Sequence, residues 1–172
     1  MTVWTIGHGT RPLEELVSML TDAGVRTLID VRRFPGSRRN PQFNVPELRT
    51  AAEGAGVAYR HAVELGGRLS NEPGEDEFDC IRVKAFRSYA ARMRTQGWQL
   101  ALDTALREPD ACFMCSETPW WRCHRRLIAE LLHARGERIV HLLAPGRAQD
   151  HVAWSISEVR DGTLRLCGQP VA

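Results

Sequence analysis

The sequence contains almost no lysine: its 23 basic residues are 22 arginines and a single lysine, Lys84. Long apolar runs are also missing, because no stretch approaches the ~18 apolar residues that a membrane-spanning helix requires. Positive and negative charges nearly cancel, and the net charge of +2 excludes a large, uniformly basic surface for nucleic acid. These absences exclude a membrane-spanning protein, and any functional argument must rest on where the arginines cluster.

The N-terminal residues lack a basic region followed by an apolar stretch, so we expect no signal peptide and a cytoplasmic location. The five cysteines are an odd number in a chain without an export signal. Free thiols, a metal site or a reactive cysteine are therefore expected ahead of a disulfide framework. The length of 172 residues, with 43% hydrophobic and 26% charged residues, predicts a single globular domain over 1–172.

Short apolar segments alternate with segments of helical periodicity along most of the chain. We predict strands near residues 3–6, 27–31, 57–61, 111–115 and 138–143, with helices between them. Thr10 is the expected N-cap of the first helix. Asp161-Gly162 is expected to turn a C-terminal hairpin. The predicted fold class is α/β: a mainly parallel sheet of about five strands flanked by helices, with an edge that the hairpin could extend.

Titratable side chains recur where the predicted strands end. They are His8, Asp30 with Arg32, His61, Cys115 with Glu117, and His141. In open parallel sheets, ligands bind outside the carboxyl ends of the strands, so we expect the functional site at this edge. A histidine satisfied by one backbone contact in the core is the plainer interpretation of His8 and His141. His133 and His151 are expected on the surface.

The loop after the second strand contains four arginines within eight residues, at positions 32, 33, 38 and 39. Guanidinium forks match the oxygens of phosphate or carboxylate groups in two-point contacts. We therefore predict an anion site in which Arg32 and Arg38 bind the anion. Ser37 and Asn40 would assist. His8 and Asp30 are candidate catalytic residues, although Asp30 could simply hold Arg32 in place.

Other interpretations of the charged and aromatic residues in this loop are also open. The acidic residues of 70–79, a segment expected to be an exposed and mobile loop, could neutralise the arginines. Phe34 and Phe43 could stack on a nucleic-acid base, although aromatic residues in such loops more often anchor the loop to the core.

The segment from Cys112 to Arg126 carries the second set of reactive groups. A thiol near a helix N-terminus and beside arginine has its thiolate stabilised, which is how reactive cysteines arise. Cys123 or Cys115 is therefore a candidate nucleophile or redox thiol. An acid and a histidine nearby could transfer protons. The full set is Cys115 and Glu117 at a strand end, and Cys123, His124 and Arg125 early in a helix, with Arg125 as a third anion-binding arginine.

A metal site and inert, buried cysteines are the alternatives for this segment. Cys112 and Cys115 would point to opposite faces of their strand, which argues against a four-ligand site. Cys115, Cys123 and His124 could still form a three-ligand site. Cys80 and Cys167 fit no such cluster and are interpreted as structural.

Several motifs together resemble those of domain-of-unknown-function family 488. They are Thr5-Ile-Gly-His8, Asp30-Val-Arg32, the segment Pro35 to Asn44, Leu65-Gly-Gly67, Ala85-Phe86 with Tyr89-Ala90, Cys115-x-Glu117 and Cys123-His-Arg125. The resemblance runs from about Val3 to Leu143 and implies a compact α/β domain with an extension over about 145–172. It departs at Gly9, where the family commonly has serine. It implies no activity, because the family name assigns none.

These patterns predict an enzyme that acts on a phosphate-bearing substrate, either a nucleotide or a nucleic acid, at a Cys/Glu/His site with an arginine anion pocket. We expect neither a cofactor nor a resident metal, and no membrane partner. The alternatives are a nucleic-acid-binding module without turnover and a metal-binding or thiol redox protein.

Overall fold

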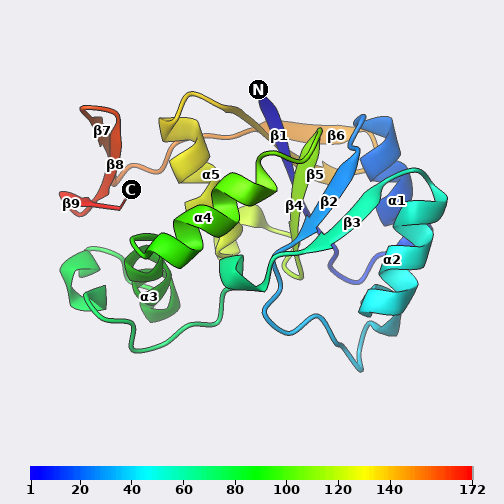
Figure 1. The fold of residues 1–172 in the computed structure, drawn as a ribbon, viewed down its shortest axis with the longest axis horizontal. Coiled ribbons are helices and arrows are strands. Elements are labelled where there is room, and N and C mark those ends of the chain that lie inside the picture. The colour runs from blue at the N-terminus through cyan, green and yellow to red at the C-terminus, as the bar shows by residue number, and fades with distance from the viewer. Residues whose placement is uncertain (172) are drawn as a thin grey trace.

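A six-stranded sheet forms the centre of the computed structural model, which describes residues 1–171 (Figure 1). Its strands are β1 (Thr2–Gly7), β2 (Thr27–Asp30), β3 (Ala58–His61), β4 (Ala111–Cys115), β5 (Arg138–Ala144) and β6 (Arg147–Asp150). They are ordered β3-β2-β4-β1-β5-β6, and all pairs are parallel except β5 with β6. The predicted α/β class with a mainly parallel sheet is confirmed.

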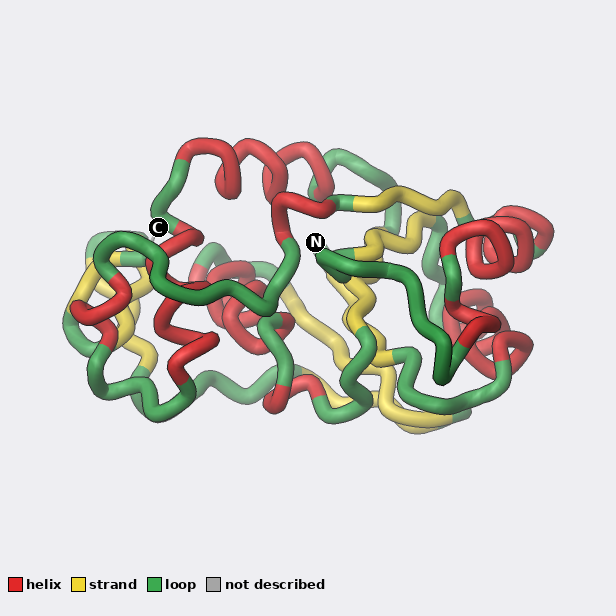
Figure 2. Tube along the Cα trace, turned by 90° about the horizontal axis from the view of Figure 1, so that it is seen from below, coloured by secondary structure: helices red, strands yellow, loops and turns green. Residues whose placement is uncertain are grey.

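Helices cover both faces of this sheet (Figure 2). They are α1 (Leu13–Asp22), α2 (Val45–Gly54), α3 (Lys84–Met93), α4 (Gln96–Ala105) and α5 (Arg125–Ala134). Side chains along β4 alternate between the two faces of the sheet. Cys112 and Met114 belong to the buried cluster under α1 and α2, and Phe113 and Cys115 belong to the cluster under α3, α4 and α5. Cys112 and Cys115 therefore point to opposite faces, as predicted.

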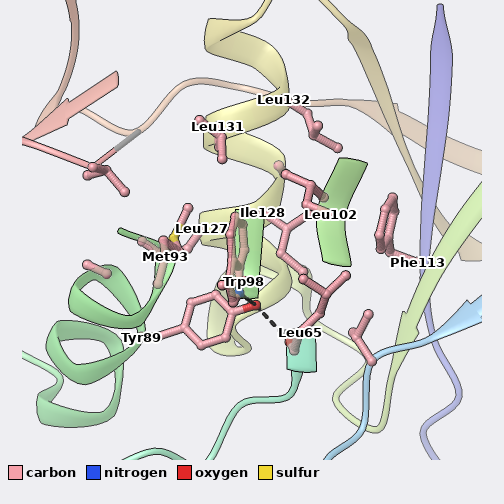
Figure 3. Packing of buried hydrophobic residues seen from close by; sticks show 14 of the residues in the cluster. Leu65, Tyr89, Met93, Trp98, Leu102, Phe113, Leu127, Ile128, Leu131 and Leu132 are labelled. Atoms are coloured by element: carbon pink, nitrogen blue, oxygen red, sulfur yellow. Dashed lines mark hydrogen bonds between the residues drawn. The ribbon is translucent and has the colours of Figure 1, made fainter. Parts of the chain in front are cut away.

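Tyr89 on α3 connects the larger buried cluster to a loop that reaches the functional site (Figure 3). Its hydroxyl donates to the carbonyl oxygen of Leu65 at 2.7 Å and accepts from Trp98 Nε1 at 3.2 Å. Burial without a carboxylate partner raises the pKa of Tyr89, so the hydroxyl stays protonated and remains a donor. This bond fixes the start of the segment Leu65-Gly66-Gly67, which forms one wall of the site described below.

Two details of the predicted elements are wrong. The first helix begins at Leu13 with Pro12, not Thr10, as its N-cap, because proline already holds the extended backbone that precedes the helix. The hairpin does not extend the main sheet: β7 (Ser157–Arg160) and β8 (Thr163–Leu166) form a separate sheet with β9 (Gln169–Pro170). Asp161 and Gly162 both have positive φ, as the predicted tight turn requires.

The small C-terminal sheet is attached to the rest of the chain in two ways. Leu164 and Leu166 of β8 belong to the same buried cluster as α5. Cys167 forms a disulfide with Cys80, with a Cα–Cα distance of 5.6 Å. The expectation of free thiols ahead of disulfides is therefore wrong for this pair, because no local sequence pattern links cysteines that are 87 residues apart.

None of the helices within residues 1–171 combines the length and the apolar character that crossing a membrane would require.

Candidate functional site

A cavity of about 770 Å³ opens at the carboxyl ends of β1, β2 and β4, the sheet edge at which the sequence predicts a site. Its walls come from the loop after β2, from Gly67 and Arg68, from the start of α3, and from the segment between β4 and α5. Eight of the predicted site residues line it: His8, Arg32, Ser37, Asn40, Cys115, Glu117, Cys123 and His124.

The other three predicted residues do not line the cavity. Asp30 is fully buried beneath Arg32 and pairs with it, which fits the plainer of its two interpretations, while its catalytic role stays a prediction. Arg38 is exposed on the loop but does not face the cavity, so its predicted anion-binding role is not supported by its position. Arg125 is only 1% exposed and lies behind the cavity lining, so its predicted contact with an anion stays a prediction.

Arg32 is held rigidly at the base of the cavity. Its Nε and Nη2 donate to the two carboxylate oxygens of Asp30 at 2.9 and 2.6 Å, and Tyr59 donates to the same carboxylate at 2.7 Å. His8 Nδ1 lies 2.8 Å from the carbonyl oxygen of Gly9, so Nδ1 carries the proton and Nε2 can accept from Arg32 Nη1 at 3.4 Å. Two of the five guanidinium hydrogens of Arg32 remain free to bind a ligand.

The ring of His8 stays neutral in this arrangement. Burial and the positive charge of Arg32 lower its pKa to about 4, and it stacks on Phe43 with a centroid separation of 4.3 Å. Phe43 is fully buried and therefore anchors the loop to the core. Phe34 is 64% exposed and lines the cavity, so of the two phenylalanines only Phe34 is placed to touch a ligand.

The rim of the cavity carries four more arginines: Arg33, Arg39, Arg68 and Arg122. All four are exposed, and none forms an ion pair with a carboxylate in residues 1–171. The single acidic side chain among the lining residues is Glu117. The cavity is therefore strongly positive, as an anion site requires.

The acids of residues 70–79 do not neutralise these arginines. Instead, Glu72 pairs with Arg92 at 2.6 Å and Glu77 with Arg94 at 3.0 Å, while Glu75 lies 3.6 Å from Lys84. The alternative of a self-neutralised loop is therefore wrong. The segment also contains a 3₁₀ helix, Glu75–Phe78, with Phe78 fully buried, so it is packed rather than wholly exposed.

Two sulfur atoms lie together at the floor of the cavity. The Sγ atoms of Cys115 and Cys123 are in contact, although their Cα atoms are 7.6 Å apart. Disulfides usually join Cα atoms about 4.4–6.8 Å apart, so a relaxed bond between these residues requires backbone movement. The structure thus brings together the two cysteines that the sequence analysis left as separate candidates.

Each sulfur has its own donor from α5. The Nε of Arg125 donates to Cys115 Sγ at 2.9 Å, and the backbone N–H of Arg125 donates to Cys123 Sγ at 3.4 Å. A guanidinium and a helix N-terminus both favour a thiolate over a thiol. The side chain of Arg125 therefore faces the protein's own sulfur atoms rather than solvent, because the strands and the loop between β4 and α5 enclose it.

His124 faces the same sulfur pair from the cavity wall. Its Nε2 donates to the carbonyl oxygen of Val31 at 3.1 Å, which leaves Nδ1 as an acceptor 3.6 Å from Cys123 Sγ. Burial and the nearby Arg125 lower the pKa of His124 to about 4, so the ring is neutral at pH 7. His124 can accept a hydrogen bond from the Cys123 thiol but cannot act as a fixed positive charge.

Two glycines allow the walls to approach so closely. A side chain at Gly67 would collide with the His124 ring, and one at Gly9 would collide with Thr118, where the φ of +54° also favours glycine. The glycines of Leu65-Gly-Gly67 therefore serve contacts within the protein. The departure from serine at position 9 is explained by Thr118, whose hydroxyl occupies that space.

The residues 1–171 contain no group of three or more histidine, cysteine or acidic side chains arranged as metal ligands. Cys115, Cys123 and His124 do not form such a group, because His124 directs Nε2 to a backbone carbonyl and the two sulfurs contact each other. The three-ligand metal site considered from the sequence is therefore not formed by this geometry.

Sequence reasoning missed several residues of the site. Arg33 and Arg39 lie in the arginine-rich loop, but the sequence does not tell which of its arginines face the cavity. Arg68 and Arg122 follow Gly67 and Trp121, and a basic residue beside these motifs is the signal that could have identified them. His151, expected on the surface, is 9% exposed and contacts His141.

Residues 12–132 match a family that is described as "Domain of unknown function DUF488". The matched range is shorter at both ends than the resemblance expected from about Val3 to Leu143, and it excludes Thr5, His8 and the C-terminal extension. No curated protein and no solved structure matches the chain.

Proposed function

The chain belongs to the DUF488 family, and from the chemistry of its site we propose an enzyme that acts on a phosphate-bearing substrate, a nucleotide or a nucleic acid. The observation that carries the proposal is the 2.9 Å contact between Arg125 Nε and Cys115 Sγ at the floor of a cavity rimmed by unpaired arginines. A stabilised thiolate and a site for an anion are thus parts of one cavity.

The arginine rim supports a phosphate group as the recognised feature. Arginine binds phosphate through paired N–H donors, and the four rim arginines with Arg32 supply more positive charge than one carboxylate would need. The exposed ring of Phe34, with the Arg33 guanidinium 5.6 Å above it, offers a face on which a base could stack. A nucleotide combines both features.

Cys115 is the nucleophile in this proposal. Its sulfur meets the full positive charge of Arg125, whereas Cys123 faces a neutral histidine. Cys123 would then keep its proton and direct it to His124 Nδ1, because two adjacent thiolates cannot both be charged at low cost. Glu117 is exposed at the cavity wall and would exchange a proton with the substrate.

The test is the rate at which iodoacetamide alkylates Cys115 in the freshly reduced protein between pH 5 and 9. Tryptic cleavage after Arg122 separates Cys115 from Cys123, and peptide fragmentation separates Cys115 from Cys112. Cys112 is an internal control, because burial raises its pKa and its side chain is fully enclosed. We expect Cys115 to react as a thiolate below pH 7 while Cys112 stays unmodified.

The same reaction measures ligand binding. Inorganic phosphate, adenosine monophosphate and a short oligonucleotide should each slow the alkylation of Cys115 in a saturable way. Slowed alkylation without any thiolate reactivity below pH 8 would instead indicate a nucleic-acid-binding module. If neither phosphate nor a nucleotide protects Cys115 at millimolar concentration, the proposal is wrong.

A thiol redox function is the second candidate, and the contact between the sulfurs of Cys115 and Cys123 favours it. In this function the Cys115 thiolate would attack a disulfide and displace one thiolate, or attack a peroxide and release water or an alcohol to leave a sulfenic acid. Cys123 would then attack the sulfur of Cys115, which releases the second thiol or water and leaves an intramolecular disulfide. Cys123→Ser separates the two candidates: it should abolish the intramolecular disulfide under oxidised glutathione but leave phosphate protection of Cys115 unchanged. Loss of both would show that Cys123 belongs to the anion site.

A further inference from the structure

A chain of buried polar side chains runs from Arg125, behind the cavity floor, to the C-terminal extension. We propose that Thr5, His141 and His151 are positioning residues that hold the guanidinium of Arg125 against Cys115, with His151 supplied by the extension. The inference rests on the proposed function, since it concerns the thiolate of the same site. It assigns a role to residues outside 12–132, the range that the family match covers.

The chain of contacts is continuous and enclosed. Arg125 Nη1 donates to Thr5 Oγ1 at 3.2 Å, and Thr5 Oγ1 lies 2.7 Å from His141 Nδ1. His141 Nε2 lies 3.0 Å from His151 Nδ1. All four side chains are buried, with His151 the most exposed at 9%. Water is therefore not available to satisfy these groups, and each must find its partner within the protein.

The donor and acceptor at each step follow from chemistry alone. Arginine can only donate, so Thr5 Oγ1 accepts from Arg125 and gives its own hydrogen to His141 Nδ1. His141 then carries its proton on Nε2 and donates to His151 Nδ1. His151 in turn carries its proton on Nε2, which lies 3.2 Å from Glu130 Oε1, at ion-pair distance although not aligned as a hydrogen bond.

Hydrogen-bond donation in the opposite direction, from His151 to His141 and from His141 to Thr5, is unfavourable at both ends of this chain of contacts. It would leave the hydroxyl hydrogen of Thr5 without an acceptor, and it would point the Nε2 lone pair of His151 at the Glu130 carboxylate. Burial, together with the neighbouring His151 ring and the positive charge of Arg125, lowers the pKa of His141 to about 3, so the ring is neutral at pH 7. A protonated His141 would compete with Arg125 for the oxygen of Thr5.

The groups packed around His141 keep it in this orientation. Trp120 stacks flat on its ring, with centroids 4.1 Å apart and an interplanar angle of 5°. The charged or titratable groups that face the pair of histidines are Arg125, Glu130 and His133, the last with its ring 5.5 Å from His151. Trp120 thus prevents His141 from rotating away from Thr5.

Glu130 anchors the extension that carries His151. Its two carboxylate oxygens accept from the backbone N–H of Trp154 at 2.6 Å and from the hydroxyl of Ser157 at 2.7 Å. The backbone N–H of His151 also donates to the carbonyl oxygen of Ile139 on β5 at 2.9 Å. The segment that follows β6 is therefore fixed on both sides of His151, which allows the imidazole to act as a rigid acceptor for His141.

Arg125 depends on this chain because Thr5 is the acceptor for its Nη1 group, which donates to none of its other partners. Its Nη2 donates to the carbonyl oxygens of Glu117 and Thr118, and Nε donates to Cys115. Thr5 on β1 and Cys115 on β4 are thus the two acceptors that the sheet provides. Without Thr5, the guanidinium can rotate toward the loop, and its Nε–H no longer points at the sulfur.

The test compares the pH profile of Cys115 alkylation in Thr5→Val and Thr5→Ser. Valine has the shape of threonine but no hydroxyl, whereas serine keeps the hydroxyl. We expect Thr5→Val to slow alkylation at pH 7 by roughly tenfold and to move the profile to higher pH, because a hydrogen bond to a charged group is lost. Thr5→Ser should follow the wild-type profile. A Thr5→Val profile equal to that of the wild type would overturn the inference.

A second pair of variants tests the extension. His151→Ala removes the acceptor for His141, and His133→Ala removes the exposed neighbouring histidine, which is outside the chain of contacts. We expect His151→Ala to shift the profile in the same direction as Thr5→Val and His133→Ala to leave it unchanged. Equal profiles for His151→Ala and His133→Ala would overturn the role of the extension. If wild-type Cys115 is itself unreactive below pH 8, the proposed function fails instead.

Discussion

Asp30 and Arg32 form a buried two-point ion pair at the base of the cavity, with oxygen–nitrogen distances of 2.6 and 2.9 Å. Asp30 is fully buried and Arg32 is 6% exposed. Together with Tyr59 and His8, the pair uses most of the polar atoms of both side chains. Arg32 is therefore a preorganised donor to a ligand, and its orientation does not have to be fixed when the ligand binds.

Replacing Asp30 with alanine should destabilise the fold strongly, because it leaves the Arg32 guanidinium buried without a counter-charge. Breaking a buried pair in this way costs about 3–5 kcal/mol. The measurement is the free energy of unfolding in urea. Glu108→Ala is the matched control: it removes the partner of Arg60 in an exposed pair and should cost less than ~1 kcal/mol. Equal losses in the two variants would contradict this account of Arg32.

Neighbouring arginines of the loop should differ in their effect on ligand binding. Arg39 lines the cavity, whereas Arg38 does not, and both are exposed. Arg39→Gln should weaken protection of Cys115 by inorganic phosphate by about tenfold, which corresponds to the loss of about 1.4 kcal/mol in binding free energy. Arg38→Gln should have little effect. Equal weakening in both variants would mean that phosphate responds to the overall charge of the loop rather than to the cavity.

The folded protein should lose stability as the pH falls below about 6.5, the ordinary pKa of histidine in an unfolded chain. Burial lowers the pKa of His8 and His124 to about 4 and that of His141 to about 3. Between about pH 6.5 and 4 the unfolded chain binds protons at these positions while the folded chain does not, so protonation favours unfolding. Above pH 6.5 this contribution to stability is fully present.

The urea midpoint measured at pH 7.5 and at pH 5 checks this prediction. Each buried histidine contributes a slope of up to ~1.4 kcal/mol per pH unit in that window. The variant His141→Gln should show a smaller difference between the two midpoints than the wild type, whereas His133→Gln, at an exposed position, should match the wild type. Identical midpoints at both pH values would contradict the burial of neutral histidines.

The disulfide between Cys80 and Cys167 should stabilise the attachment of the small C-terminal sheet. It closes a loop of 87 residues in sequence separation, and bonds of this kind contribute typically about 2–4 kcal/mol to the free energy of unfolding. Cys167→Ala should lower the urea midpoint, and dithiothreitol should then have much less effect on the variant than on the wild type. That residues 1–172 form one domain stays a prediction, for which a single unfolding transition in both proteins is expected.

The parallel strands could be predicted from the sequence because each is a short apolar segment between helical patterns. β6 could not, because all four of its residues are exposed and an exposed strand shows no apolar alternation. The order of the strands in the sheet could not be predicted from the sequence either. Nothing local indicates that β1 lies between β4 and β5, since strand pairing depends on contacts between distant segments.

The location of the candidate site followed from the rule for parallel sheets, but the role of Arg125 did not. Its neighbours Arg126 and Arg122 suggest a solvated basic patch, and only the folded structure places its Nε 2.9 Å from Cys115. His151 was missed for the same reason. A single histidine in a polar segment looks exposed until β6 pairs with β5 and brings it to His141.

The position of β1 at the centre of the sheet affects how the chain folds during synthesis. Trp4 pairs with Cys112 on one side and with Val140 on the other, so both neighbours of the first strand are made more than 100 residues after it. The ribosome releases N-terminal segments first, and long-range strand pairing is slow. The earliest strand must therefore stay unpaired until β4 has emerged, and the cavity at its end, whose lining extends to His124, cannot form before then.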